Sequence, residues 1–201
     1  MKITALKRQV KNIDRVSVFV DQKYSFSLTD SEVLQLGIKN GLHVSPQDIE
    51  SFKKLSADGK VRARTLEWVL ARPHSQKELQ DYLYRKKVDP ELADKIKQEC
   101  EQRHYIDDVS YAEWYVQYLR RKNKSSKAVR YELMKKGISN TIVQDIMQHY
   151  ESDDASIHAV MQKIDNKPRY ADPQKKITYL LSKGFSYSDI KQAMAVQLPE
   201  E

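Results

Sequence analysis

The sequence predicts a mainly α-helical protein: tandem three-helix repeats that form an elongated array, preceded by a small α+β extension with a β-hairpin. Three observations predict it. Apolar residues recur at helical intervals from about residue 60 onward, only the first 28 residues alternate with a period of two, and the 201 residues include just 5 Gly and 6 Pro. Such repeats stack on their neighbours and expose long surfaces, which suits binding along grooves or filaments.

The N-terminal extension is expected over residues 1–58. Alternating side chains flank a turn at residues 21–23: Val16, Val18, Val20, Tyr24, Phe26 and Leu28. This alternation predicts an antiparallel hairpin, to which we expect residues 3–8 to add a third strand. Thr29 and Glu32 form a capping box for a short helix that stops at Gly37. A second helix is expected from Ser45 to about Gly59.

Three similar units follow, at residues 60–106, 107–151 and 152–198. In two of them apolar residues lie 4, 8, 13, 17 and 21 positions after a serine: Leu79, Leu83, Val88, Leu92 and Ile96 after Ser75, and Val129, Leu133, Ile138, Ile142 and Ile146 after Ser125. After Asp172 the pattern is shifted by about one residue: Ile177, Leu181, Phe185, Ile190 and Met194. One further helix precedes each pair, at roughly 61–72, 108–122 and 153–166, so each unit has three helices.

Catalytic signatures are scarce. We find no Gly-rich phosphate loop and no histidines at metal-ligand spacing, and the lone Cys100 cannot form an internal disulfide. Asp107 and Asp108, near His104, are explained more simply as the capped start of a helix. No apolar run is long enough for a signal peptide or a membrane span. We therefore expect a cytoplasmic protein without enzymatic activity, cofactor or small-molecule substrate.

The positive charge of the chain is concentrated in residues 120–136. This segment has eight Lys or Arg against the single acid Glu132, and its excess of +7 equals the net charge of the whole protein. On a helical wheel Val129 and Leu133 share one side, while most of the cations and Tyr131 share the other. A solvated face is one interpretation. The near absence of acids favours the other, a surface for a polyanion or an acidic groove. The candidate binding residues are Arg120, Arg121, Lys122, Lys124, Lys127, Arg130, Tyr131, Lys135 and Lys136.

Residues 111–119, YAEWYVQYL, form an aromatic helix. Its spacing predicts packing within or between units, with Trp114 and Tyr118 partly exposed.

Two stretches resemble a known family. TLEWVLARPHSQKELQDYLYRKKV and YIDDVSYAEWYVQYLRRKNKSSKAVRYELMKKGI are similar to the first and second repeats of the RecX family of recombinase regulators. The second stretch shares these positions: Asp107, Asp108, Tyr111, Ala112, Arg120, Arg121, Glu132, Leu133, Lys136, Gly137 and Ile138. The chain departs from the family at two turns, where Lys87 and the region 123–125 replace expected glycines. Residues 1–58 look like an extension that some members carry.

The resemblance implies a non-catalytic modulator that lies along the groove of the RecA–DNA filament and restrains filament growth, ATP hydrolysis and strand exchange. Its expected partners are the RecA filament and single- and double-stranded DNA. The alternative is a helical-repeat protein that binds DNA or RNA directly, with no obligatory RecA partner. The residues leave open the role of the hairpin and whether RecA is inhibited or stimulated.

Overall fold

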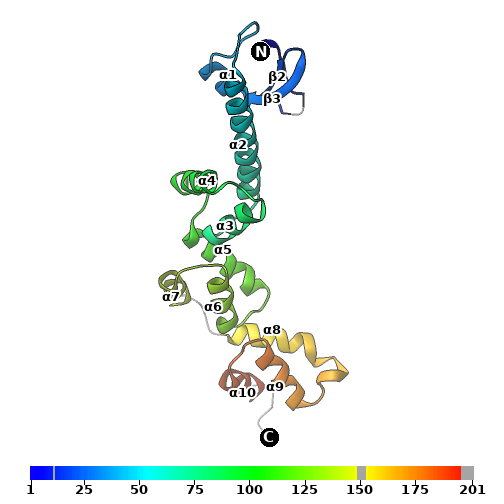
Figure 1. Cartoon of the computed structure of the whole chain (residues 1–201). Coiled ribbons are helices and arrows are strands. Elements are labelled where there is room, and N and C mark those ends of the chain that lie inside the picture. Colours follow the sequence, from blue (N-terminus) through cyan, green and yellow to red (C-terminus); the bar gives the residue numbers. More distant parts are fainter. Residues whose placement is uncertain (11, 149–152, 196–201) are drawn as a thin grey trace. The chain divides into compact units, whose positions relative to one another are not determined.

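The computed structural model describes residues 1–10, 12–148 and 153–195. The chain divides into two compact units, the first of Met1–Trp68 with Val88–Leu92, the second of Val69–Lys87 with Ala93–Glu201. The described residues are mostly helical, with a small antiparallel sheet near the N-terminus (Figure 1). The predicted mainly α class with an N-terminal α+β extension is therefore confirmed. The predicted ends of the second and third units, at 151 and 198, lie outside the described residues.

The sheet of the first unit has the strand order β1-β2-β3, with β1 at Ile3–Arg8, β2 at Arg15–Val20 and β3 at Lys23–Thr29. Both pairings are antiparallel, as predicted for the hairpin and its third strand. Asp21 and Gln22 form the β2–β3 turn with positive φ angles of 46° and 68°. Two successive left-handed residues give a tight turn whose twist matches that of the flanking strands.

One face of the sheet packs into the core of the first unit, where Val18, Phe26 and Leu28 are buried. The prediction that Tyr24 shares this face was wrong. The pairing shifts register between Val18 and Phe19, which leaves Tyr24 52% exposed and edge-on to the Phe19 ring at 6.1 Å. An extra residue in one strand turns the following side chain to the other face of a sheet, and the period-two pattern gives no sign of it.

Helix α1 (Asp30–Gln35) begins at the predicted capping box. The Glu32 amide donates to Thr29 Oγ1 at 3.2 Å, and the Thr29 amide donates to Glu32 Oε2 at 2.7 Å. Gly37 follows the helix with a φ of 62°, a left-handed conformation in which glycine carries no side-chain penalty.

Helix α2 (Pro46–Leu70) corrects the sequence analysis, which placed a helix end near Gly59 and a new helix at 61–72. The helix runs through Gly59, whose φ is not positive. Arg15, which is buried, explains the glycine: it donates to Ser27 Oγ at 3.2 Å, and a Cβ on Gly59 would lie 3.3 Å from its Nη1. Gly59 thus makes room for a buried guanidinium and does not end the helix.

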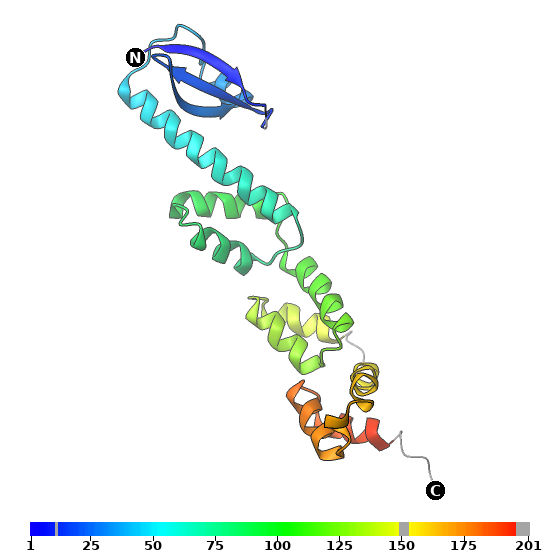
Figure 2. The same ribbon diagram turned by 90° about the vertical axis from the view of Figure 1, so that its right-hand side faces the viewer.

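Eight more α-helices and one 3-10 helix follow among the described residues (Figures 1 and 2). Their bounds are α3 at Gln76–Arg85, α4 at Pro90–Gln102, α5 at Asp108–Arg121, α6 at Ser126–Lys135, α7 at Asn140–Gln148, α8 at Asp154–Asp165, η1 at Pro168–Tyr170, α9 at Pro173–Ser182 and α10 at Tyr187–Ala195. Helices α5, α6 and α7 enclose one hydrophobic core, and α8, α9 and α10 enclose another.

In the first two repeats the predicted core residues eight positions after the capping serine, Leu83 and Leu133, are buried. In the third repeat the predicted core residue Leu181 is 44% exposed, and Leu180 is fully buried in its place. Leu180 lies 8 residues after Asp172, the same offset as the two other leucines. Because leucines occupy both positions, the sequence fits the shifted pattern with Leu181 as well as the unshifted pattern with Leu180. In the packing of α9 the unshifted residue, Leu180, is the buried one.

The same left-handed turn follows each middle helix. Lys87, Gly137 and Gly184 each lie 12 residues after the capping residue, with φ angles of 52°, 83° and 89°. The first repeat therefore keeps the conformation of the turn although lysine replaces the glycine.

Candidate functional site

The candidate site is built on α6, and two buried residues fix the orientation of this helix. Ser125 caps its start, because the Ser125 hydroxyl accepts a hydrogen bond from the Ala128 amide at 3.1 Å. Val129 and Leu133 are both fully buried in the core of the second repeat. Burial of this stripe forces the opposite stripe toward solvent.

The outward face of α6 carries three of the predicted cations. Lys127, Arg130 and Lys135 are exposed, together with Tyr131 at 66% and Met134 at 50%. These five positions follow the i, i+3, i+4, i+7, i+8 spacing of one helix face. Among the described residues no ion pair engages the three cations. The outward face is therefore positively charged, apolar at two points and without an acid.

Four of the other five predicted cations lie where α5 ends and α6 begins. Arg120 and Arg121 occupy the last turn of α5, where positive charge favours the helix dipole. Lys122 caps that helix, and its Nζ lies 5.6 Å from the centre of the Tyr118 ring. Lys124 is half-buried in the short connection that leads to α6. Because this connection is only a few residues long, these side chains stay next to the start of the outward face.

Lys136 has a different place from the rest of the predicted set. Its Nζ lies 2.6 Å from Glu78 Oε1 on α3, and it also lies over the Tyr115 ring at 5.8 Å. Glu78 is largely buried, and its Oε2 lies 2.9 Å from Arg72 Nη1 and 3.1 Å from His74 Nδ1. Lys136 therefore forms an ion pair within the protein, in the contact between the first and second repeats.

Charge pairing controls the protonation of this cluster. Burial alone would raise the pKa of Glu78, but hydrogen bonds and charges from Arg72 and Lys136 outweigh it and lower the pKa to about 2. Burial and the neighbouring Glu78 carboxylate raise the pKa of Tyr111, whose hydroxyl lies 3.4 Å from Glu78 Oε1. Glu78 is therefore ionised at neutral pH and binds its cations in a largely dry setting.

The contacts between repeats recur, and sequence reasoning missed them. The Ser75 hydroxyl donates to the Lys136 carbonyl at 2.8 Å, and the Ser125 hydroxyl donates to the Lys183 carbonyl at 3.2 Å. Each capping serine therefore binds its own helix and the end of the equivalent helix in the next repeat. The sequence did contain a signal for these contacts, because Ser75 and Ser125 are the residues from which the five matching apolar offsets are counted.

A second contact accompanies each serine. The Gln76 amide donates to Asp108 Oδ1 at 2.8 Å, and the Ser126 amide donates to Asp153 Oδ1 at 2.7 Å. The sequence predicts that Asp107 and Asp108 both belong to the capped start of a helix. This holds for Asp107, which accepts from the Val109 amide at 2.9 Å, while burial raises the pKa of Asp108 in the contact between repeats.

The aromatic residues of α5 pack as expected. Tyr111 is buried and stacks on Tyr115 with ring centres 5.5 Å apart, while Tyr118 at the outer end is 40% exposed. Trp114 is half-buried, and the Arg72 guanidinium lies 5.8 Å from the centre of its ring. The stack thus contributes to the contact between the first and second repeats.

Two features are absent from the described part of the chain. No group of three or more His, Cys, Asp or Glu side chains is placed to hold a metal ion there. None of the helices described is both long and apolar enough to span a bilayer.

The fold and the site define a helical-repeat protein with a small N-terminal α+β part and a basic face on one helix of its second repeat. Comparison with known proteins gives the family. The regulatory protein RecX N-terminal domain matches residues 1–45, and the second three-helix domain of RecX matches residues 107–147. The chain belongs to the RecX family of regulatory proteins.

Related proteins and solved structures agree with this placement. The chain is similar to regulatory protein RecX of Listeria innocua, at 29% identity over 100% of this chain and 77% of the relative. It is also similar to that of Clostridium botulinum strain Alaska E43, at 27% identity over 96% and 94%. A crystal structure of regulatory protein RecX has a TM-score of 0.69 at 21% identity, covering 96% of this chain and 98% of the other. RecX from Lactobacillus salivarius has a TM-score of 0.57 at 24% identity, covering 69% and 94%.

Proposed function

We propose that this chain is a non-catalytic regulator of RecA in the cytoplasm, which binds the RecA–DNA filament and inhibits its assembly, ATP hydrolysis and strand exchange. Membership of the RecX family supports a regulatory role. The observation that carries the proposal is the outward face of α6, where Lys127, Arg130 and Lys135 are exposed, whereas Glu132, the one acid of this helix, is half-buried.

The spacing of these cations suits a long polyanion. Eight residues of helix separate the first from the last, which is about 12 Å at the helical rise. Neighbouring cations are closer, about 4.5 and 7.5 Å apart along the axis, which is within the screening length of about 8 Å at physiological salt, so they act on the same stretch of the partner. Binding to phosphates releases counterions, and a filament of protein and DNA offers both phosphates and acidic side chains.

A specific observation also favours direct binding to DNA or RNA. Tyr131 is 66% exposed among the cations, and an aromatic ring in such a setting can stack on an unpaired base. For this alternative, contact of five basic side chains with phosphates would give a log-log salt slope of roughly −3.5 on naked single strands. A slope near zero on naked strands would exclude it, because no phosphates would then be engaged.

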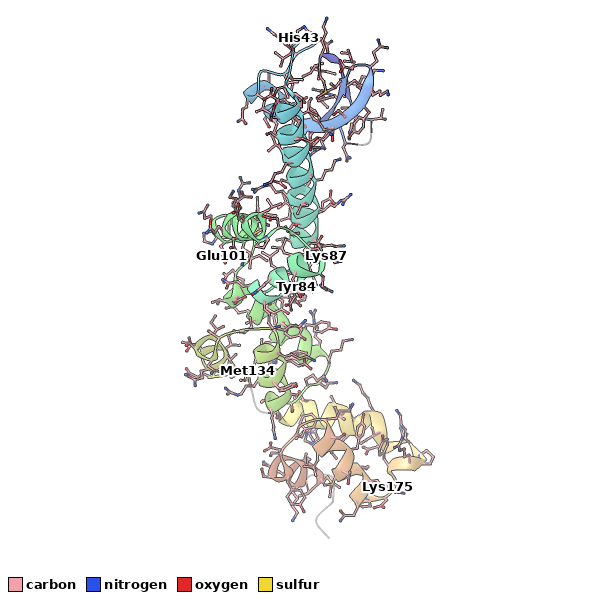
Figure 3. All side chains as sticks on the ribbon, in the orientation of Figure 1. His43, Tyr84, Lys87, Glu101, Met134 and Lys175 are labelled. Atoms are coloured by element: carbon pink, nitrogen blue, oxygen red, sulfur yellow. The ribbon has the colours of Figure 1, made fainter. Side chains whose placement is uncertain are left out.

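The test is the combined substitution Lys127→Glu, Arg130→Glu and Lys135→Glu. All three side chains are exposed, so we expect a folded helical protein that has lost most of its inhibition of the DNA-dependent ATPase of RecA. The matched control is Lys95→Glu, Lys167→Glu and Lys175→Glu, which changes the net charge equally at exposed positions elsewhere (Figure 3 labels Lys175). Inhibition that stays at the wild-type level in the first variant would show that the face of α6 is only solvated.

A further inference from the structure

Each of the three middle helices exposes one large apolar side chain at the same position. Tyr84 on α3, Met134 on α6 and Leu181 on α9 each lie nine residues after the capping residue, and they are 83%, 50% and 44% exposed (Figure 3 labels the first two). Single exposed apolar residues are common on protein surfaces and need no explanation. In the described residues, however, no other offset exposes a large apolar side chain in all three repeats. We call Tyr84, Met134 and Leu181 the exposed row.

The preceding residue explains why the exposed row points outward. Leu83, Leu133 and Leu180 are each at most 2% exposed. Adjacent residues of an α-helix are rotated by about 100°, so a fully buried residue at one position turns its neighbour away from the core. The exposed row is thus a fixed property of the repeat and does not depend on the rotamer of one side chain.

The contacts between repeats place the row in regular order. The first repeat joins the second through Ser75 and the Lys136 carbonyl, and the second joins the third through Ser125 and the Lys183 carbonyl. The turn glycines belong to the same contacts: a Cβ on Gly137 would lie 2.7 Å from Lys77 Cβ. A Cβ on Gly184 would lie 2.7 Å from the Oγ of the capping serine of α6. Because both steps use the same hydrogen bond from the capping serine to the carbonyl before the turn glycine, the equivalent side chains follow one another in the order of the repeats.

Cations stand next to each member of the row. Tyr84 is followed by Arg85, Lys86 and Lys87, Met134 by the exposed Lys135, and Leu181 by Lys183 after one residue. Lys183 Nζ lies 5.0 Å from the centre of the Tyr179 ring, which holds this charge close to the helix surface. A complementary site is therefore an apolar pocket with carboxylates at its edge.

We infer that the exposed row is the docking surface for a protein polymer of identical subunits, each of which offers such an acid-edged apolar pocket. A partner that repeats the same pocket can bind three equivalent side chains at once. Nucleic acid fits less well, because Met134 and Leu181 have neither a hydrogen-bonding group nor an aromatic ring to stack on a base. The inference rests on the proposed function and assigns the contact with RecA subunits to this row.

The experiment replaces the row by serine, singly and together: Tyr84→Ser, Met134→Ser and Leu181→Ser. Binding is measured by fluorescence anisotropy to single-stranded DNA coated with RecA and, in parallel, to the same strand naked. We expect each single change to weaken filament binding by about 5- to 30-fold and the triple change by at least about 100-fold. Binding to naked DNA should stay within about 2-fold of wild type, because no cation is removed.

The matched controls are exposed apolar residues at other offsets, Val109→Ser and Tyr187→Ser, at 45% and 52% exposure. They should leave filament binding unchanged, and circular dichroism should show the wild-type helix content in every variant. Filament binding by the triple variant at the wild-type level, or an equal loss in the controls, would overturn the inference while the proposed function stands. A wild-type chain that does not bind the filament would overturn both.

Discussion

Glu78 offers the sharpest test of the contact between the first two repeats. Its carboxylate forms ion pairs with Lys136 Nζ at 2.6 Å and Arg72 Nη1 at 2.9 Å, and its side chain is 13% exposed. The substitution Glu78→Gln keeps the shape of the side chain and removes the charge. It leaves two cations facing a neutral amide, a change that destabilises a largely buried cluster.

The magnitude follows from the pKa. A fall from 4.5 to about 2 corresponds to about 3 kcal/mol of preference for the ionised form in the folded state. Residual solvent contact screens these charges, so we expect Glu78→Gln to lower the free energy of unfolding by about 2 kcal/mol at pH 7. A carboxyl whose pKa falls on folding stabilises the protein above its unfolded pKa. This contribution is present above pH 4.5 and is lost as the pH falls toward 2.

The assay is urea unfolding followed by tryptophan fluorescence in a Trp68→Phe background. Trp114 then reports alone, and it lies beside the cluster, with Arg72 5.8 Å from the centre of its ring. We expect the difference between wild type and Glu78→Gln to shrink by more than half between pH 7 and about pH 2.5. Glu91→Gln removes an exposed carboxylate from the first turn of α4 and should change stability by about 0.5 kcal/mol or less. A difference for Glu78→Gln that does not change with pH would refute the assigned role of the charge.

Two further predictions concern the same contact. Gly137→Ala combines a φ of 83° with a Cβ 2.7 Å from the facing lysine, so it should cost about 2 kcal/mol or more in thermal unfolding. Gly37→Ala has a φ of 62° and open space around it, so it should cost about 1 kcal/mol; equal costs would contradict the close approach at Gly137. Lys136→Gln should lower stability and barely change filament binding, whereas Lys135→Gln should do the reverse. If both substitutions weakened filament binding to a similar extent, Lys136 would have to be counted among the binding residues.

Local chemistry made several elements of the fold predictable. The hairpin at residues 15–28 and the Thr29 capping box depend on neighbours in sequence, and both are present in the structure, although the alternation fails at Tyr24. The offsets of Leu83 and Leu133 reflect helical geometry, and both leucines are buried. Such patterns persist because packing uses the same periodicity that the sequence shows.

Tertiary contacts account for the rest. Gly59 resembled a helix terminator because only the folded chain brings Arg15 against it. The choice between Leu180 and Leu181 depends on how α9 rotates in its core. For the candidate site, the outward face of α6 followed from periodicity, but the role of Lys136 depends on Glu78, 58 residues away in sequence. No pattern within one helix could separate Lys136 from the lysine beside it.

The central claim is that this chain recognises RecA assembled on DNA. The most direct measurement compares its affinity for single-stranded DNA coated with RecA and for the same strand naked, at one salt concentration. We expect binding to the coated strand to be at least about tenfold tighter, because protein contacts add to those with phosphate. Equal affinity for the two would contradict it.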